Sequence, residues 1–324
     1  MTLFDGRTVL VTGGTGSFGK RFTRTLLDTT DVRKLIVFSR DELKQFEMQR
    51  AFPDEPRIRF FIGDVRDYQR LYRAFHAVDI VVHAAALKQV PAAEYNPFEA
   101  VKTNVNGAQN VIEAAIEQDV KRVIALSTDK ACSPINLYGA TKLVSDKLFI
   151  NGNAYAGGTS TRFAVVRYGN VVGSRGSVVP YFRQLASTGE LPITDERMTR
   201  FWITLEQGVR FVMESLERMH GGELFVPKIP SMKVTDLAAA LAPDARLRVV
   251  GIRPGEKLHE EMISSPDARR TLDMGSYYVI QPEMEWWPEQ QLSGEPVREG
   301  FSYASDTNSE WLSVDELRAM ALDA

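Results

Sequence analysis

The chain has 324 residues, of which 44% are hydrophobic and 25% are charged, and these fractions exclude a disordered or fibrous protein. Its 39 Lys and Arg residues against 42 Asp and Glu residues leave a formal charge of -3, so no basic excess is available for a nucleic-acid backbone. The single cysteine, Cys132, cannot form an intrachain disulfide, and the four histidines show no metal-ligand spacing. We therefore expect no nucleic-acid partner and no metal.

The sequence does not predict export or membrane insertion. Residues 1–13 lead directly into a strand-like segment without a basic region and an apolar region before it. No apolar run approaches the roughly 18 residues that span a bilayer. We therefore expect a cytoplasmic protein without membrane contact. At ~100–200 residues per domain, the length predicts two domains, or one large domain with an elaborated end.

Short runs of β-branched or aromatic residues alternate with longer segments of mixed polarity. The runs predict strands at Thr8–Val11, Leu35–Phe38, Ile58–Ile62, Ile80–Val82, Val123–Leu126 and Ala164–Val166. Apolar residues at helical spacing predict a helix over Asn104–Ile116 and another that begins near Tyr138. This alternation predicts the α/β class, with a Rossmann-like, doubly wound parallel sheet and a smaller C-terminal substrate-binding part.

A glycine-rich turn follows the first strand and precedes a predicted helix. Residues without a side chain allow a tight turn and let the backbone approach a pyrophosphate, while the N–H groups of the helix N-terminus face the anion. Glycine-rich turns are common, but the position of this one between strand and helix favours a dinucleotide site. The residues that we expect to bind the cofactor here are Gly13, Thr15, Gly16, Ser17, Phe18 and Gly19.

The end of the second strand predicts which dinucleotide is bound. An NAD site is expected to carry Asp or Glu about 20 residues beyond the glycines, to bind the ribose 2′-hydroxyl. Ser39 and Arg40 stand there instead, and a hydroxyl beside a guanidinium suits a 2′-phosphate. We therefore expect NADP, with Lys44 on the same rim. Asp41 follows directly and weakens this inference, and a surface Arg at a strand end is the alternative.

Two later strand ends contribute to the same site by their position. Asp64, before Val65, is placed to accept a hydrogen bond from the adenine amino group. The fourth strand is followed by three small residues that would lie beside the cofactor, namely Ala84, Ala85 and Ala86. Taken alone, each of these residues fits ordinary turn and packing chemistry better.

Tyr138 and Lys142 are four residues apart in a predicted helix, so both side chains project from one face. A free phenol has a pKa of ~10, and lowering it to about 7 takes ~4 kcal/mol, which an adjacent ammonium and a nicotinamide cation would supply. The phenolate would then take a proton from an alcohol while hydride leaves the same carbon for the cofactor. A strand ending in Ser127-Thr128 precedes this helix by one short loop, and we expect the Thr128 hydroxyl in the same cleft.

Longer strings of the sequence carry a specific resemblance. The TGGTGSFG turn, the STDKA segment and the YGATK helix resemble the extended short-chain dehydrogenase/reductase family. Within it, the chain resembles the inverting UDP-N-acetylglucosamine 4,6-dehydratases that open the pseudaminic acid pathway, through AAALKQVP, STDKACSPINLYGATKL, GNVVGSRGSVVP, RPGEKLHEEM and SDTNSEWL. Membrane-anchored relatives carry a long N-terminal extension and often have Met in place of Tyr138, so the chain is similar to the short soluble type.

The resemblance implies oxidation of the sugar at carbon 4, loss of water across carbons 5 and 6, and return of the hydride to carbon 6. The product would be UDP-2-acetamido-2,6-dideoxy-beta-L-arabino-hexos-4-ulose, for surface glycan or pseudaminic acid synthesis. It also implies Asp129 as the acid for the departing hydroxyl and Lys130 as the base at carbon 5. A base must be partly neutral, so we expect burial and neighbouring positive charge to lower the pKa of Lys130. A solvated Asp-Lys pair in a loop is the alternative.

The substrate, UDP-N-acetylglucosamine, is expected to rest on the later segments of the chain. The regular alternation of strands and helices ends near Asn170, which predicts a cofactor domain over residues 1–170 and a substrate-binding part over residues 171–324. A helix from about Leu205 to Met219 and a strand at Leu224–Val226 are expected to return to the first sheet. Guanidinium groups suit a diphosphate. The expected substrate-binding residues are Lys88, Asn170, Arg175, Arg200, Arg253 and Glu256.

Other functions stay open at this point. A nucleotide-sugar 4-epimerase or a dehydratase that retains carbon 5 would use the same scaffold. An NADP-sensing binding protein without chemistry would not need Tyr138, Lys142, Asp129 and Lys130 together. We also expect the chain to form a homo-oligomer.

Overall fold

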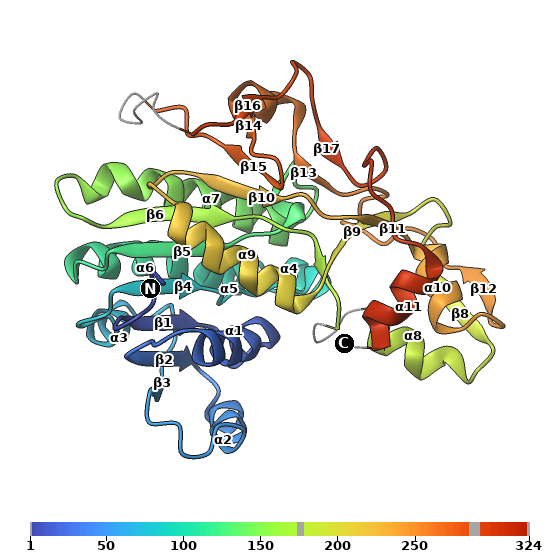
Figure 1. Cartoon of the computed structure of the whole chain (residues 1–324). Coiled ribbons are helices and arrows are strands. Elements are labelled where there is room, and N and C mark those ends of the chain that lie inside the picture. The colour runs from blue at the N-terminus through green and yellow to red at the C-terminus, as the bar shows by residue number, and fades with distance from the viewer. Residues whose placement is uncertain (1, 174–177, 285–291, 323–324) are drawn as a thin grey trace.

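The computed structural model describes residues 2–173, 178–284 and 292–322. Its centre is a ten-stranded sheet (Figure 1). The strands are β1 (Thr8–Thr12), β2 (Lys34–Ser39), β3 (Ile58–Ile62), β4 (Ile80–His83), β5 (Arg122–Leu126), β6 (Arg162–Val166), β10 (Leu224–Pro227), β14 (Thr271–Asp273), β15 (Tyr277–Ile280) and β16 (Glu295–Pro296).

The strand order is β16-β14-β15-β10-β6-β5-β4-β1-β2-β3. Neighbouring strands from β3 to β10 run parallel, and β15, β14 and β16 are added antiparallel at one edge. The central strands are buried along their whole length, as expected when helices cover both faces of a parallel sheet. This architecture confirms the predicted Rossmann-like α/β class.

Helices join the parallel strands and cover the sheet. They are α1 (Ser17–Thr29), α2 (Glu42–Arg50), α3 (Tyr68–Ala74), α4 (Val90–Tyr95), α5 (Pro97–Val101), α6 (Gly107–Glu117), α7 (Leu137–Ala156) and α9 (Leu205–Arg218). α1 packs against α9, and α6 packs against both α3 and α7. Figure 1 shows α9 crossing in front of the sheet. The segment predicted as one helix over Asn104–Ile116 begins with a π-helical turn, Lys102–Asn106, before α6.

A second, smaller lobe lies to the right of the sheet in Figure 1. Its own hydrophobic core includes Leu191, Trp202, Leu237 and Leu317, and it is separate from the core around the large sheet. The lobe and the strands beside it comprise β7 (Asn170–Val171), α8 (Val178–Ala186), β8 (Glu190–Ile193), β9 (Thr199–Ile203), β11 (Ser231–Lys233), α10 (Val234–Leu241), β12 (Arg246–Val249), β13 (Glu261–Ile263), β17 (Tyr303–Ala304) and α11 (Val314–Leu322).

The chain passes between the two lobes more than once. It leaves the large sheet after β6, returns through α9 and β10, builds α10 and β12 in the smaller lobe, and comes back for β14 and β15.

Among the described residues, no helix is long and apolar enough to cross a membrane. No group of three or more His, Cys, Asp or Glu side chains in those same ranges is arranged to hold a metal ion.

Candidate active site

A cleft with a volume of about 1290 Å³ lies where the carboxyl ends of the parallel strands face the smaller lobe. Its walls come from the residues after β1, β2, β4 and β5 on one side and from β9 and the segment before β13 on the other. Pockets for one small ligand have volumes of about 300–1,000 Å³. The cleft therefore has room for more than one ligand.

The glycine-rich turn forms one end of this cleft. Gly13 has φ +65°, and a Cβ there would lie 2.9 Å from the Ala84 carbonyl oxygen, so only a bare backbone fits beside the end of β4. Gly19 faces inward instead, because its Cβ would lie 2.4 Å from the Gly14 Cα. This bare cradle at the N-terminus of α1 fits a dinucleotide pyrophosphate. The predicted residues of the turn that line the cleft are Gly13, Thr15, Gly16, Ser17 and Phe18.

The rim after β2 carries the side chains predicted to select NADP. Ser39 is buried, and its hydroxyl accepts a hydrogen bond from Gln45 Nε2 at 3.1 Å. Arg40 is half-exposed, with Nη1 3.5 Å from Asp64 Oδ2. Lys44 Nζ lies 2.5 Å from Asp41 Oδ2, so the acidic residue that weakened the NADP inference neutralises a neighbouring lysine. The Arg40 guanidinium thus lines the cleft, forms an ion pair with Asp64 and also acts electrostatically on Glu99.

Asp64 differs from its neighbours in this part of the site. Both of its oxygens accept hydrogen bonds from Arg66, at 2.9 Å from the backbone N–H and 2.7 Å from Nη2. It is outside the set of residues that line the cleft, whereas Val65 and the three alanines after β4 belong to that set. The expected contact of Asp64 with adenine stays a prediction.

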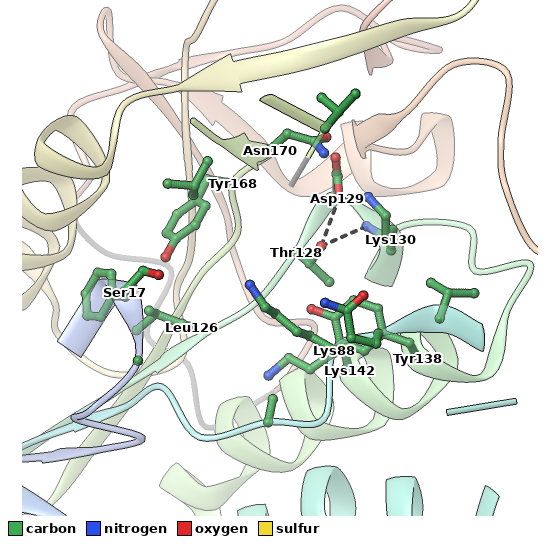
Figure 2. Close-up of a pocket in the computed structure, with 18 of the residues that line it drawn as sticks. Ser17, Lys88, Leu126, Thr128, Asp129, Lys130, Tyr138, Lys142, Tyr168 and Asn170 are labelled. Atoms are coloured by element: carbon green, nitrogen blue, oxygen red, sulfur yellow. Dashed lines mark hydrogen bonds and ion pairs between the residues drawn. The ribbon is translucent and has the colours of Figure 1, made fainter. Parts of the chain in front are cut away.

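Helix α7 places Tyr138 and Lys142 in the cleft, as Figure 2 shows. Its N-terminus is fixed by Asn136, whose Oδ1 accepts the Gly139 N–H at 2.7 Å. A Cβ at Gly139 would lie 2.0 Å from the Lys130 carbonyl oxygen. The missing side chain at Gly139 therefore lets the helix pack closely against the short 3-10 turn Asp129–Ala131.

Burial governs the ionisation of this pair. Burial raises the pKa of Tyr138 to about 12, although Lys130 and the Thr128 hydroxyl act in the opposite direction. Burial lowers the pKa of Lys142, against the influence of Asp146 one turn further along the helix. The phenol is therefore protonated in the protein alone, and the positive charge expected from a nicotinamide would be needed to make it acidic.

Asp129 and Lys130 lie together at the end of β5. The Thr128 hydroxyl donates to Asp129 Oδ1 at 2.9 Å, and Lys130 Nζ donates to the same oxygen at 3.0 Å (Figure 2). Glu260 approaches the amine from the segment just before β13, with Oε1 3.2 Å from Nζ. Asp129 is 1% exposed and the Lys130 side chain 24%, so the carboxylate is buried while the amine side chain keeps some exposure.

The expected direction of the Lys130 pKa is wrong. Burial acts to lower that pKa and Arg200 adds to this, but the carboxylates of Asp129 and Glu260 outweigh both and leave the pKa of Lys130 raised. The sequence does not show that Glu260 lies beside the amine, and its negative charge reverses the expected direction. In this structure Lys130 is therefore a cation held between two carboxylates.

Five of the predicted substrate-binding residues line the cleft, with differing partners: Lys88, Asn170, Arg200, Arg253 and Glu256. Burial lowers the pKa of Lys88, which lines the cleft with Asn170. The Arg200 guanidinium lies within 3.0 Å of the Lys257 and Leu258 carbonyl oxygens, so Arg200 anchors this segment from β9. Exposed Arg253 lies 3.8 Å from Glu256, and both line the cleft. Arg175 lies outside the described residues.

Several cleft or supporting residues had no clear signal in the sequence. Asn104, in the π-helical turn, bonds both backbone groups of Leu87 at 2.8 and 2.9 Å and so fixes the loop that carries Lys88. Tyr168 lines the cleft near Ser17 (Figure 2). Glu260 lies within a string that carried the family resemblance, but two adjacent glutamates stand there and no pattern distinguishes them.

The comparisons with known proteins agree with this geometry. The family model described as "Polysaccharide biosynthesis protein" matches residues 9–282. A protein of Campylobacter jejuni named UDP-N-acetylglucosamine 4,6-dehydratase (inverting) is 58% identical over 325 residues, which cover 97% of each chain. A Rickettsia canadensis protein named UDP-glucose 4-epimerase is 43% identical over 86% of this chain and 84% of its own.

Solved structures with the same fold include Pen from Bacillus thuringiensis. It has a TM-score of 0.92 at 37% identity and covers 99% of both chains. DesIV, a dTDP-glucose 4,6-dehydratase from Streptomyces venezuelae solved with NAD and TYD bound, has a TM-score of 0.70 at 26% identity. That match covers 78% of this chain and 86% of DesIV.

Proposed function

The chain belongs to the polysaccharide biosynthesis protein family, and on this premise we propose that it is a UDP-N-acetylglucosamine 4,6-dehydratase that inverts carbon 5. The observation that carries the proposal is the presence of two proton-transfer pairs in one cleft: Tyr138 with Lys142, and Asp129 with Lys130. An oxidation at carbon 4 needs the first pair only, and removal of water needs a further acid and base. The 58% identical relative bears the name of that reaction.

The first pair serves the oxidation. NADP, when bound on the glycine turn, would supply the hydride acceptor. Tyr138 would take the proton of the carbon-4 hydroxyl, and Lys142, which lies on the same face of α7, would favour the phenolate by its charge. Thr128 would hydrogen-bond to the reacting oxygen, and its hydroxyl donates to Asp129, so it would connect the two pairs.

The second pair serves the elimination. Loss of water breaks the carbon-5 C–H bond, whose electrons form the new double bond, and breaks the carbon-6 C–O bond, whose oxygen receives a proton. The predicted roles need a neutral Lys130 and a protonated Asp129. One proton moved along the 3.0 Å hydrogen bond from Nζ to Oδ1 produces this state from the ion pair, with no change in total charge.

NADP rather than NAD is the cofactor that the rim supports. Arg40 offers a guanidinium at the cleft, and Ser39 precedes it with a hydroxyl. An acidic side chain that would bind the ribose 2′-hydroxyl is expected at this strand end in an NAD site. Asp41 does not fill that role well, since it caps α2 and is paired with Lys44.

The substrate would lie between the lobes. Lys88 and Asn170 would contact the sugar or diphosphate, Arg175, Arg200 and Arg253 the diphosphate or uridine, and Glu256 the ribose or Arg253. This assigns residues 1–170 to the cofactor and residues 171–324 largely to the substrate, with α9, β10 and β14 to β16 returning to the large sheet. The homo-oligomeric state and cytoplasmic location stay predictions.

Conversion of UDP-N-acetylglucosamine by the purified chain with NADP tests the function. We expect a product lighter by one water, with carbon 5 inverted in its NMR spectrum. Replacement Tyr138→Phe should slow turnover by at least ~10²-fold while cofactor binding persists, because a general acid-base group is lost. A 4-epimerase would release no water, a retaining dehydratase would leave carbon 5 unchanged, and a sensing protein would give no product.

A further inference from the structure

Glu260 approaches the Asp129–Lys130 pair from the opposite wall of the cleft. Its Oε1 lies 3.2 Å from Lys130 Nζ, and Asp129 Oδ1 lies 3.0 Å from the same nitrogen. The two carboxylates come from segments 131 residues apart in the sequence, one at the end of β5 and one just before β13. The amine is thus held between two segments that are far apart in the sequence.

Ser305 fixes the Glu260 backbone through both the N–H and the carbonyl group of Glu260. Its N–H donates to Ser305 Oγ at 2.9 Å, and the Ser305 N–H donates to the Glu260 carbonyl oxygen at 2.8 Å. Both residues are buried, with Glu260 2% and Ser305 0% exposed. The carboxylate therefore has little freedom to move away from Lys130.

The charges around Glu260 leave Lys130 as its closest counterion. Arg200 Nε is 3.8 Å away, and its two terminal nitrogens donate to backbone carbonyl oxygens. Lys257 Nζ donates to the Cys132 carbonyl oxygen. Glu260 Oε2 is buried and has no hydrogen-bond partner among the described residues. A buried carboxylate in such surroundings is strongly destabilising unless a cation is paired with it.

We propose that Glu260 is a positioning residue for Lys130, which directs the amine toward the reacting sugar and stabilises its protonated form. The proposal rests on the dehydratase function. When Lys130 takes the carbon-5 proton, the C–H bond breaks, its electron pair stays with the substrate, and a new N–H bond makes the amine a cation. Glu260 places a negative charge 3.2 Å from that cation, so it strengthens Lys130 as a base.

Other charged or titratable groups also face this amine and set the background for its titration. They are Asp129 from its own turn, Tyr138 from α7 and Arg200 from β9, while Lys257 acts on Glu260 from the segment before β13. Burial and Asp129 raise the pKa of Glu260, whereas Lys130, Arg200 and Lys257 act to lower it. Replacement of Glu260 removes its anionic form, one of two anions beside the amine, and leaves the other groups in place. The pKa of Lys130 must then fall.

Chemical labelling of Lys130 in Glu260→Gln tests the charge without relying on activity. Acetic anhydride reacts with neutral amines only, and a pKa lower by one unit makes the neutral fraction ten times larger. At pH 8, without cofactor or substrate, we expect the Lys130 peptide to be acetylated at least tenfold faster in Glu260→Gln than in the unaltered chain. Glu261→Gln is the matched control, since that carboxylate bonds Ser133 and not Lys130.

Exchange of carbon-5 hydrogen with heavy water gives the second measurement. The basic limb of its pH profile should move to lower pH by about one unit or more in Glu260→Gln, while KM changes less than twofold. The pH profile of Glu260→Asp, which keeps the charge, should lie between those of the unaltered chain and Glu260→Gln. If Glu260→Gln does not fold, Glu260→Asp serves for the same measurement. Unchanged labelling or an increase in KM alone would overturn the proposal. Faster labelling in a chain without dehydratase activity would reject only the proposed function.

Discussion

Asp129 and Lys130 provide the most direct distinction between dehydration and simple redox chemistry at the residue scale. Their side chains form an ion pair in a nearly buried site, and this pair must become neutral for the predicted roles. Each role acts on a different bond of the substrate. Separate variants therefore have separable isotope signatures.

Lys130→Ala should still bind NADP and UDP-N-acetylglucosamine, but it should neither wash deuterium into carbon 5 from heavy water nor release product. Asp129→Asn should stop loss of water, because no proton reaches the leaving hydroxyl, while exchange at carbon 5 partly survives. Mass spectrometry and NMR of substrate and product in heavy water measure both effects. Exchange and dehydration at the unaltered rate in Lys130→Ala would favour a 4-epimerase.

The prediction that the cofactor is NADP depends mainly on Arg40. We expect Arg40→Ala to weaken NADP binding by ~1.5–3 kcal/mol, the free energy of one hydrogen bond to a charged group, and to leave NAD binding nearly unchanged. Titration of both cofactors against both proteins measures this difference. Arg50→Ala, at the far end of α2, is the control. Equal losses for NADP and NAD would contradict a 2′-phosphate role.

The residues found from the sequence and those missed differ in how far their partners lie along the chain. Tyr138 and Lys142 are predictable because helical spacing alone places them on one face. Glu260 is not, since its position beside Lys130 depends on the packing of segments that are far apart in the sequence. The same separation in the sequence between Glu260 and Lys130 explains why the expected direction of the Lys130 pKa is wrong.

Local patterns predicted the elements well where one period holds throughout. The six predicted strands match β1 to β6 with small shifts at their ends, because buried parallel strands are continuous apolar runs. The π-helical turn Lys102–Asn106 could not be predicted in this way. One widened turn changes the apolar spacing by a single residue, which is too small a signal to detect. We attribute the turn to the hydrogen bonds from Asn104 to Leu87, which are tertiary contacts.

Two helical glycines allow a matched test of packing at the scale of the element. A Cβ at Gly19 in α1 would lie 2.4 Å from Gly14, so Gly19→Ala should lower the free energy of unfolding by ~1–3 kcal/mol. A Cβ at Gly208 in α9 would meet nothing within 4 Å, so Gly208→Ala should raise it by ~0.5–1 kcal/mol. Urea unfolding measures both changes. Equal effects at the two positions would show that α1 does not need a bare backbone there.

Stability of the whole molecule should depend on pH through His83. Its Nδ1 lies 2.9 Å from the Thr12 hydroxyl in the middle of the sheet, and burial, with Lys142 nearby, lowers the pKa of His83 to about 3. The unfolded value is ~6.5, so below about pH 6.5 the unfolded chain binds a proton that the folded chain does not. This contribution is therefore complete above about pH 6.5 and declines as the pH falls toward 3.

We expect His83 to account for a loss of ~1.4 kcal/mol in the free energy of unfolding between about pH 7.5 and 5.5. Urea unfolding of the unaltered chain and of His83→Gln at both pH values measures it, since the variant lacks this titration and keeps all others. Circular dichroism confirms that the variant is folded. Equal losses in the two proteins would contradict a neutral, buried His83.

Because α11 is synthesised late, the two lobes of the molecule are completed in a fixed order. Leu317 and Ala321 have no exposed surface and complete the core of the smaller lobe, where Arg318 Nε also donates to the Ala240 carbonyl oxygen at 3.2 Å. Ala321 follows Val166, the end of β6, by 155 residues. At ~5–20 residues per second, a ribosome needs about 8–30 s to make that stretch. During that interval a newly made chain contains its glycine turn and Tyr138 but not yet α11. The core of the smaller lobe, which would enclose a sugar, is therefore completed later.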